Sequence, residues 1–188
     1  MPTAAAGCDD IAVDAAGNAY VTDTTNMLVG RLARGGDRIE VWAGAGGEFG
    51  PPGGVLDGIA LVGDRLLVNA LITSKLFAVP IGADGKPGAV SEVVLDTPLD
   101  RPDGMRTFGA NGLLVAEGGG PGRLSHVVLD GNSGTRTTLR EGFPDGAVAV
   151  TVVGDMAYVL EAQFAAMRAE PGTPTKPFKA TGVVVDAP

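Results

Sequence analysis

Asp57-Gly58-Ile59-Ala60-Leu61 is one copy of a short pattern that recurs along this chain. The other copies are Asp9-Asp10-Ile11-Ala12-Val13, Asp103-Gly104-Met105-Arg106-Thr107 and Val148-Ala149-Val150-Thr151-Val152. They begin at positions 9, 57, 103 and 148, and a repeat of roughly 45–48 residues is typical of stacked or radial units. Each such unit is too small to bury its own apolar face, so neighbouring units must pack together.

Each copy opens a segment that the sequence predicts to be four short antiparallel strands. A turn rich in Gly, Asn or Asp follows the first strand, as hairpin geometry requires. The stretch 162–169 also fits the apolar spacing of a helical turn, and both interpretations stay open there. Beyond the four opening strands, the expected strands are 19–22, 65–69, 113–116 and 156–160 (second), 29–33, 75–80, 123–129 and 164–168 (third), and 38–43, 89–95, 135–140 and 181–185 (fourth).

These segments predict an all-β fold. Four short strands joined by turns, with no crossover helix, form an antiparallel blade. About 45 residues per blade is the spacing of a β-propeller. We therefore expect one β-propeller domain over residues 1–188, with four-stranded antiparallel blades at roughly 9–50, 54–98, 102–142 and 146–186.

The composition agrees with one globular domain. Hydrophobic residues make up 45% of the 188 residues, which is enough for a core and argues against disorder. The 30 glycines and 13 prolines follow no collagen-like period, so they indicate frequent turns. The net charge of −8, without any cluster of Lys or Arg, argues against a nucleic-acid partner.

No segment of the sequence is expected to direct the chain to a membrane. The start, residues 1–7, has neither a basic nor an apolar region of the kind found in signal peptides. The most apolar stretches, 59–72 and 147–160, contain charged residues, so neither is expected to span a bilayer. The expected location is cytoplasmic by default, or outside the cell if a parent gene carries an upstream signal. A single cysteine permits no internal disulfide.

The aspartates that open three of the four repeats are the candidate metal ligands. In a propeller the innermost strands line a central channel and start at the same face, so Asp9, Asp57 and Asp103 are expected to meet there. Three carboxylates that lie close together repel one another, and a bound dication removes that cost. Ca²⁺ accepts six to eight oxygen ligands in flexible geometry, which suits ligands from separate blades. The alternative is that these residues only form turns, since Asp-Gly is a common turn dipeptide.

Three further acidic residues stand at the ends of second strands, and they are Asp23, Glu117 and Glu161. They are expected to be solvated strand ends. The alternative is that they lie near the channel and contact the substrate.

Several motifs resemble one known family. Pro102-Asp103-Gly104-Met105, followed by residues 111–117, resembles the senescence marker protein/gluconolactonase/luciferin-regenerating-enzyme family. So do Leu56-Asp57-Gly58-Ile59 and residues 8–14, and the similarity extends through residues 154–161. The resemblance therefore covers nearly the whole chain, and it rests on the order and spacing of the motifs.

The resemblance implies a six-bladed propeller with a divalent ion, usually Ca²⁺, at the channel entrance. Zn²⁺, Mg²⁺ or Mn²⁺ would be the other cations. The family's enzymes hydrolyse sugar lactones and related esters. Asp103 falls on the family's metal-binding Asp, which is also its proposed general base; Asp57 falls where the family usually has a metal-binding Asn; Asp9 falls where it has an Asn close to metal and substrate.

The sequence also departs from the family. It has four repeats where the family has six blades, so the two N-terminal blades and an expected metal-binding Glu have no counterpart. We expect a four-blade portion of a six-bladed propeller, the alternative being a closed four-bladed ring. An open arc leaves apolar faces and strand edges exposed, so self-association through them is expected.

Two functions follow from these residues. The first is a divalent-metal-dependent hydrolase that acts on a small lactone or carboxylic ester, inactive if the missing blades are needed. Asp103 would accept the proton from water in that reaction. The second is a non-catalytic propeller that binds a small ligand or a protein partner at its channel face.

Overall fold

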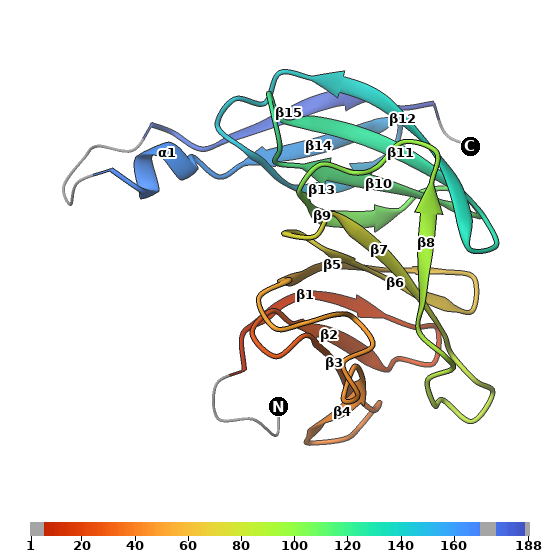
Figure 1. Ribbon diagram of the computed structural model, residues 1–188. Helices are drawn as coiled ribbons and strands as arrows, with labels where there is room; N and C mark the ends of the chain where they lie inside the picture. Colours follow the sequence, from red (N-terminus) through yellow and green to blue (C-terminus); the bar gives the residue numbers. More distant parts are fainter. Residues whose placement is uncertain (1–5, 170–175, 187–188) are drawn as a thin grey trace.

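The computed structural model describes residues 6–169 and 176–186, and apart from one short helix their regular secondary structure is β-strand (Figure 1). This confirms the predicted all-β class with antiparallel sheets. The first repeat forms one four-stranded sheet in the order of the sequence. Its strands are β1 (Cys8–Val13), β2 (Ala19–Asp23), β3 (Leu28–Leu32) and β4 (Ile39–Ala43).

The second and third repeats each form four antiparallel strands that are joined at their outer edges. A short parallel pairing of β8 with β12 makes one eight-stranded sheet, in the order β5-β6-β7-β8-β12-β11-β10-β9. The second repeat contains β5 (Leu56–Val62), β6 (Arg65–Ala70), β7 (Lys75–Pro80) and β8 (Ser91–Leu95). The third contains β9 (Pro102–Thr107), β10 (Gly112–Glu117), β11 (Arg123–Asp130) and β12 (Ser133–Glu141).

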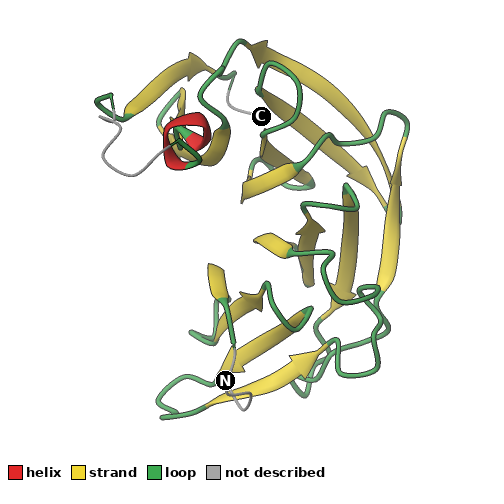
Figure 2. Cartoon of the chain, turned by 60° about the vertical axis from the view of Figure 1, so that its left-hand side comes forward, coloured by secondary structure: helices red, strands yellow, loops and turns green. Residues whose placement is uncertain are grey.

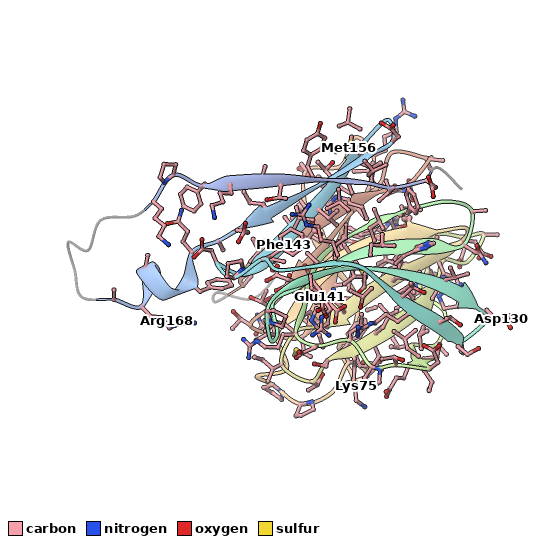
Figure 3. The ribbon with its side chains drawn as sticks, turned by 90° about the horizontal axis from the view of Figure 1, so that it is seen from above. Lys75, Asp130, Glu141, Phe143, Met156 and Arg168 are labelled. Carbon is pink, nitrogen blue, oxygen red and sulfur yellow. The ribbon has the colours of Figure 1, made fainter. Side chains whose placement is uncertain are left out.

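The β11–β12 hairpin is the longest pair in the described chain. Figure 3 shows it running from Glu141 to a tip near Asp130 at the rim of the molecule. Its outer strand, β12, alternates between exposed and half-buried residues from Ser133 to Thr137 and is exposed from Thr138 to Glu141. This pattern is that of a sheet with one solvated face, as expected for an outer strand.

The fourth repeat differs from the prediction. Its sheet contains β13 (Ala147–Val153), β14 (Met156–Glu161) and β15 (Lys179–Val184). Of the two interpretations left open for 162–169, the helical turn is confirmed: the helix α1 (Phe164–Met167) stands where a third strand at 164–168 was the alternative, in line with the helical apolar spacing there. It projects from the body of the molecule, with Arg168 beyond its end (Figures 1 and 3). The strand expected in fourth place therefore pairs directly with β14.

The turns between first and second strands have the predicted chemistry. Each contains one glycine at positive φ, a conformation that glycine adopts without steric cost. These residues are Gly17, Gly63, Gly109 and Gly154. In the described part of the chain, no helix is long and apolar enough to cross a membrane.

The sheets follow one another along an arc (Figure 2). The inner strands lie side by side, with β5 between β1 and β9, and β13 against β9. Three apolar clusters fill the spaces between successive repeats: one around Tyr20 and Phe77, one around Leu67 and Leu113, and one around Leu114 and Val159. The first and last sheets stand apart at the two ends of the arc in both ribbon views. The interfaces between sheets therefore supply the core, as expected of repeats that cannot bury their own faces.

Candidate functional site

The repeated aspartates lie in β-bulges of the inner strands. The pairing of β1 with β2 shifts by one residue between Cys8 and Ile11, and that of β5 with β6 shifts between Leu56 and Ile59. The pairing of β9 with β10 shifts at the equivalent place, and so does that of β13 with β14. A bulge inserts one extra residue and redirects the side chains beside it, which is a common device next to active sites.

The bulges bring the three predicted carboxyl groups together. The carboxyl groups of Asp103 and Asp9 lie close enough to that of Asp57 to change its pKa. Burial, followed by the nearby charges of Asp103 and Asp9, raises the pKa of Asp57 to about 9. Burial also raises the pKa of Asp103 to about 6, against hydrogen bonds from Gly104 N–H and Asp57 that lower it. The Asp9 carboxyl has a raised pKa for the same main reason, burial, with Asp10 as the next cause.

The donor set, three carboxyl groups, suits a hard dication. Among the residues that the structure describes, no three His, Cys, Asp or Glu side chains have the arrangement of a metal site. The chemistry of the cluster nevertheless fits the ion, because three adjacent carboxyl groups lose their mutual repulsion when a cation sits among them. Asp9, Asp57 and Asp103 are the residues that would hold it.

The Asp-Gly dipeptides of the second and third repeats are strand residues, so the turn interpretation is wrong. Asp57-Gly58 lies within β5 and Asp103-Gly104 within β9. A Cβ atom on Gly58 would lie 2.4 Å from the Asp103 carbonyl oxygen, and one on Gly104 would lie 2.8 Å from the Val148 oxygen. Glycine is required here because the inner strands approach each other closely.

A salt bridge crosses the inner strands beside the cluster. Arg106 of β9 donates from Nη1 to Oδ2 of Asp10 on β1 at 2.8 Å. The same carboxylate oxygen accepts the Ile59 N–H of β5 at 3.3 Å. Asp10 stands in the repeat position that is glycine in the next two repeats, and it links the inner strands of three repeats.

The acidic residues at the ends of second strands are buried, contrary to the solvated strand ends expected from the sequence. Asp23, Glu117 and Glu161 are almost fully buried. Each accepts a hydrogen bond from the backbone N–H of a residue just before the inner strand of its own repeat. The donors are Gly7 at 3.1 Å, Asp100 at 2.6 Å and Asp145 at 3.1 Å. These carboxylates therefore anchor the segment that leads into each inner strand, a role that strand patterns alone did not reveal.

Two buried polar residues near the cluster were not predicted. Thr22 and Asn69 are fully buried and stand one residue before the end of β2 and β6. A sequence signal existed, since each is a polar residue that directly follows an apolar run in its strand, residues 19–21 before Thr22 and residues 66–68 before Asn69. Because buried polar groups need partners, such residues point to a backbone that requires side-chain hydrogen bonds.

Sheets that follow an arc, with acidic bulges where their inner strands meet, define a propeller-type all-β protein. The chain is similar to the selenomethionine-substituted virginiamycin B lyase of Staphylococcus aureus, at 18% identity and a TM-score of 0.65, over 100% of this chain and 59% of that one. It is similar to a gluconolactonase of Xanthomonas campestris, at 17% identity and a TM-score of 0.62, over 81% of this chain and 53% of that one. It is also similar to a luciferin-regenerating enzyme, at 14% identity and a TM-score of 0.61, over 94% of this chain and 59% of that one.

At these identities the likeness is one of fold. In that sense it confirms the resemblance inferred from the sequence motifs. The sequence matches no family model and no curated protein at a significant level. The chain spans between 53% and 59% of the length of the three structures.

Proposed function

We propose that this chain is a four-blade portion of a six-bladed, gluconolactonase-like propeller that binds a divalent cation. The supporting observation is the convergence of Asp9, Asp57 and Asp103 from three successive inner strands, with the pKa of Asp57 raised by burial and by its two neighbours. Oxygen ligands from separate strands suit Ca²⁺, and Mg²⁺, Mn²⁺ or Zn²⁺ are the other candidates. The comparison with a gluconolactonase supports the same class of fold.

The proposed reaction is hydrolysis of a small lactone or carboxylic ester. When bound, a dication supplies Lewis acidity toward the ester carbonyl oxygen. Asp103 accepts a proton from the water whose oxygen attacks the carbonyl carbon. The ester C–O bond then breaks, and the same carboxyl returns the proton to the leaving alkoxide.

The second candidate function is a binding module without catalysis. This function is favoured because the chain covers only 59% and 53% of two of the solved structures it resembles. A complete ring would supply further groups to the site. In that case the cluster would hold a cation or a small ligand at the channel face without turnover.

A thermal melt in excess Ca²⁺ against one in EDTA tests the metal site. A ligand at about 100 times its dissociation constant adds about 2.7 kcal/mol, which raises the Tm of a domain of this size by roughly 5–10 °C. The Asp57→Asn and Asp103→Asn variants should lose most of that rise. Equal melting temperatures in Ca²⁺, Mg²⁺, Mn²⁺, Zn²⁺ and EDTA would refute the proposal.

Turnover separates the two functions. A hydrolase would open lactones or cleave p-nitrophenyl esters in the presence of the cation and lose that activity in a folded Asp103→Asn variant. Cation binding without any turnover would favour the binding module.

A further inference from the structure

Thr22 and Asn69 occupy the same place in two successive repeats. Thr22 of β2 lies opposite the bulge that contains Asp9 and Asp10. Asn69 of β6 lies opposite the bulge that contains Asp57 and Gly58. Both side chains are fully buried, so their polar atoms must find partners within the protein.

Each side chain makes the same pair of hydrogen bonds. Thr22 Oγ1 accepts the Asp10 N–H at 3.1 Å and donates to the Asp57 carbonyl oxygen at 2.7 Å. Asn69 Oδ1 accepts the Gly58 N–H at 3.2 Å, and its Nδ2 donates to the Asp103 carbonyl oxygen at 2.6 Å. Each residue thus joins the bulge of its own repeat to the aspartate backbone of the next repeat. The bonds run in series from the first bulge to Asp103.

These hydrogen bonds are absent at the third repeat, which is followed by the repeat that lacks an aspartate. The equivalent residue of the third repeat, opposite the bulge that contains Asp103, is Ala116, which forms no side-chain hydrogen bond. The inner strand of the following repeat carries Val148 in place of an aspartate. A polar linking residue is therefore present where the next repeat supplies a carboxylate and absent where it does not. If these residues served only to hold successive repeats together, a polar residue would be expected at all three contacts between repeats.

We propose that Thr22 and Asn69 are positioning residues for the cation site, a proposal that rests on the metal binding proposed above. They hold the main chain of Asp57 and Asp103 at their bulges, where the regular sheet ladder is interrupted. The carboxyl groups of both residues extend from that fixed main chain toward the cluster. Partners that orient ligands in this way tune metal affinity without touching the metal.

The test is the affinity for Ca²⁺ or Tb³⁺ alone, measured by calorimetry or sensitised luminescence. Asn69→Ala places at this position the residue that the third repeat already has, and Thr22→Val keeps the side-chain shape. Each should weaken cation binding by about 10–100-fold, the range found for partners of metal ligands. Thr22→Ser retains the hydroxyl and should restore affinity close to that of the parent chain.

A control separates positioning from general stability. Val79→Ala removes two buried methyl groups from the apolar cluster around Tyr20 and Phe77, at the end of β7 that lies away from the bulges. It should lower the Tm in EDTA as Asn69→Ala does, yet leave cation affinity unchanged. Folded Asn69→Ala and Thr22→Val variants that bind as tightly as the parent chain would overturn this inference and leave the metal site standing. A parent chain that binds no cation would overturn both proposals.

Discussion

At the scale of single residues, Asp57 carries a carboxyl group that the fold keeps protonated at neutral pH. Burial raises its pKa to about 9, and Asp103 and Asp9 add charge repulsion and hydrogen bonds in the same direction. The proton on Asp57 allows three acidic side chains to share one place in the absence of a cation. Protons and a cation therefore compete for the same oxygen atoms.

The raised pKa values predict how stability depends on pH in EDTA. The folded-state pKa values of Asp57 and Asp103, about 9 and about 6, exceed the ordinary 3.8. The folded state then binds more protons than the unfolded state, so this contribution is complete below pH 3.8 and is lost as pH rises through 6 and 9. We expect the free energy of unfolding, measured with urea in EDTA, to fall from about pH 5 to about pH 9.

The Asp57→Asn variant is the control for this pH dependence, because its amide does not ionise. Its stability should vary less over the same range. Burial also lowers the pKa of His126, so this residue makes stability rise with pH near pH 6.5. Both the parent chain and Asp57→Asn contain His126, so the difference between them reports on the cluster. A parent chain whose stability rises steadily over this window would contradict the assignment of the proton to the cluster.

At the scale of elements, the inner strands pack so closely that side chains are excluded between them. The position after the aspartate is glycine in β5 and β9 because a Cβ atom would meet the backbone of the next inner strand. The same closeness lets Thr22 and Asn69 reach across to the inner strand of the next repeat. Repeat spacing and strand position were predictable from the sequence, whereas this distance between strands was not.

Gly58→Ala tests that packing. The added Cβ would lie 2.4 Å from the Asp103 carbonyl oxygen and 2.8 Å from Asn69 Nδ2, so we expect a loss of about 1–3 kcal/mol from overpacking. Chemical denaturation measures it. Gly118→Ala is the matched control, since its Cβ would have no neighbour nearer than 3.6 Å. Equal stability of the two variants would show that β5 and β9 are further apart than described.

At the scale of the whole molecule, the arc ends in two apolar surfaces. On the last sheet, Val153, Tyr158, Leu160 and Val184 are exposed on the face opposite to the one that packs on the third repeat. At the other end, Ile11 and Val13 are 57% and 60% exposed on β1. Both surfaces have the composition of the interfaces between successive sheets, which are filled by apolar clusters. Apolar patches of this kind promote association.

We predict that the isolated chain self-associates through these end surfaces. A contact between the first sheet of one copy and the last sheet of another is head-to-tail, so it need not close into a ring. Light scattering across a concentration series should show a mass that increases with concentration. Val153→Lys combined with Val184→Lys should suppress the increase, whereas Val94→Lys, at an exposed valine of the outer strand β8, should not. A monomer at every concentration would refute the prediction.

The sequence by itself determined the repeat, the antiparallel strands, the glycine turns and the three candidate aspartates. All of these are encoded locally, by spacing and by residues that suit strands or turns. The tertiary structure alone decided that the aspartates lie in bulges and that Asp23, Glu117 and Glu161 are buried anchors. It also decided between a strand and a helix at residues 164–167, where the local pattern fitted both. It also revealed the links made by Thr22 and Asn69, which join residues 34 and 35 positions apart. Such contacts depend on how closely neighbouring sheets pack, and no local pattern of residues specifies that distance.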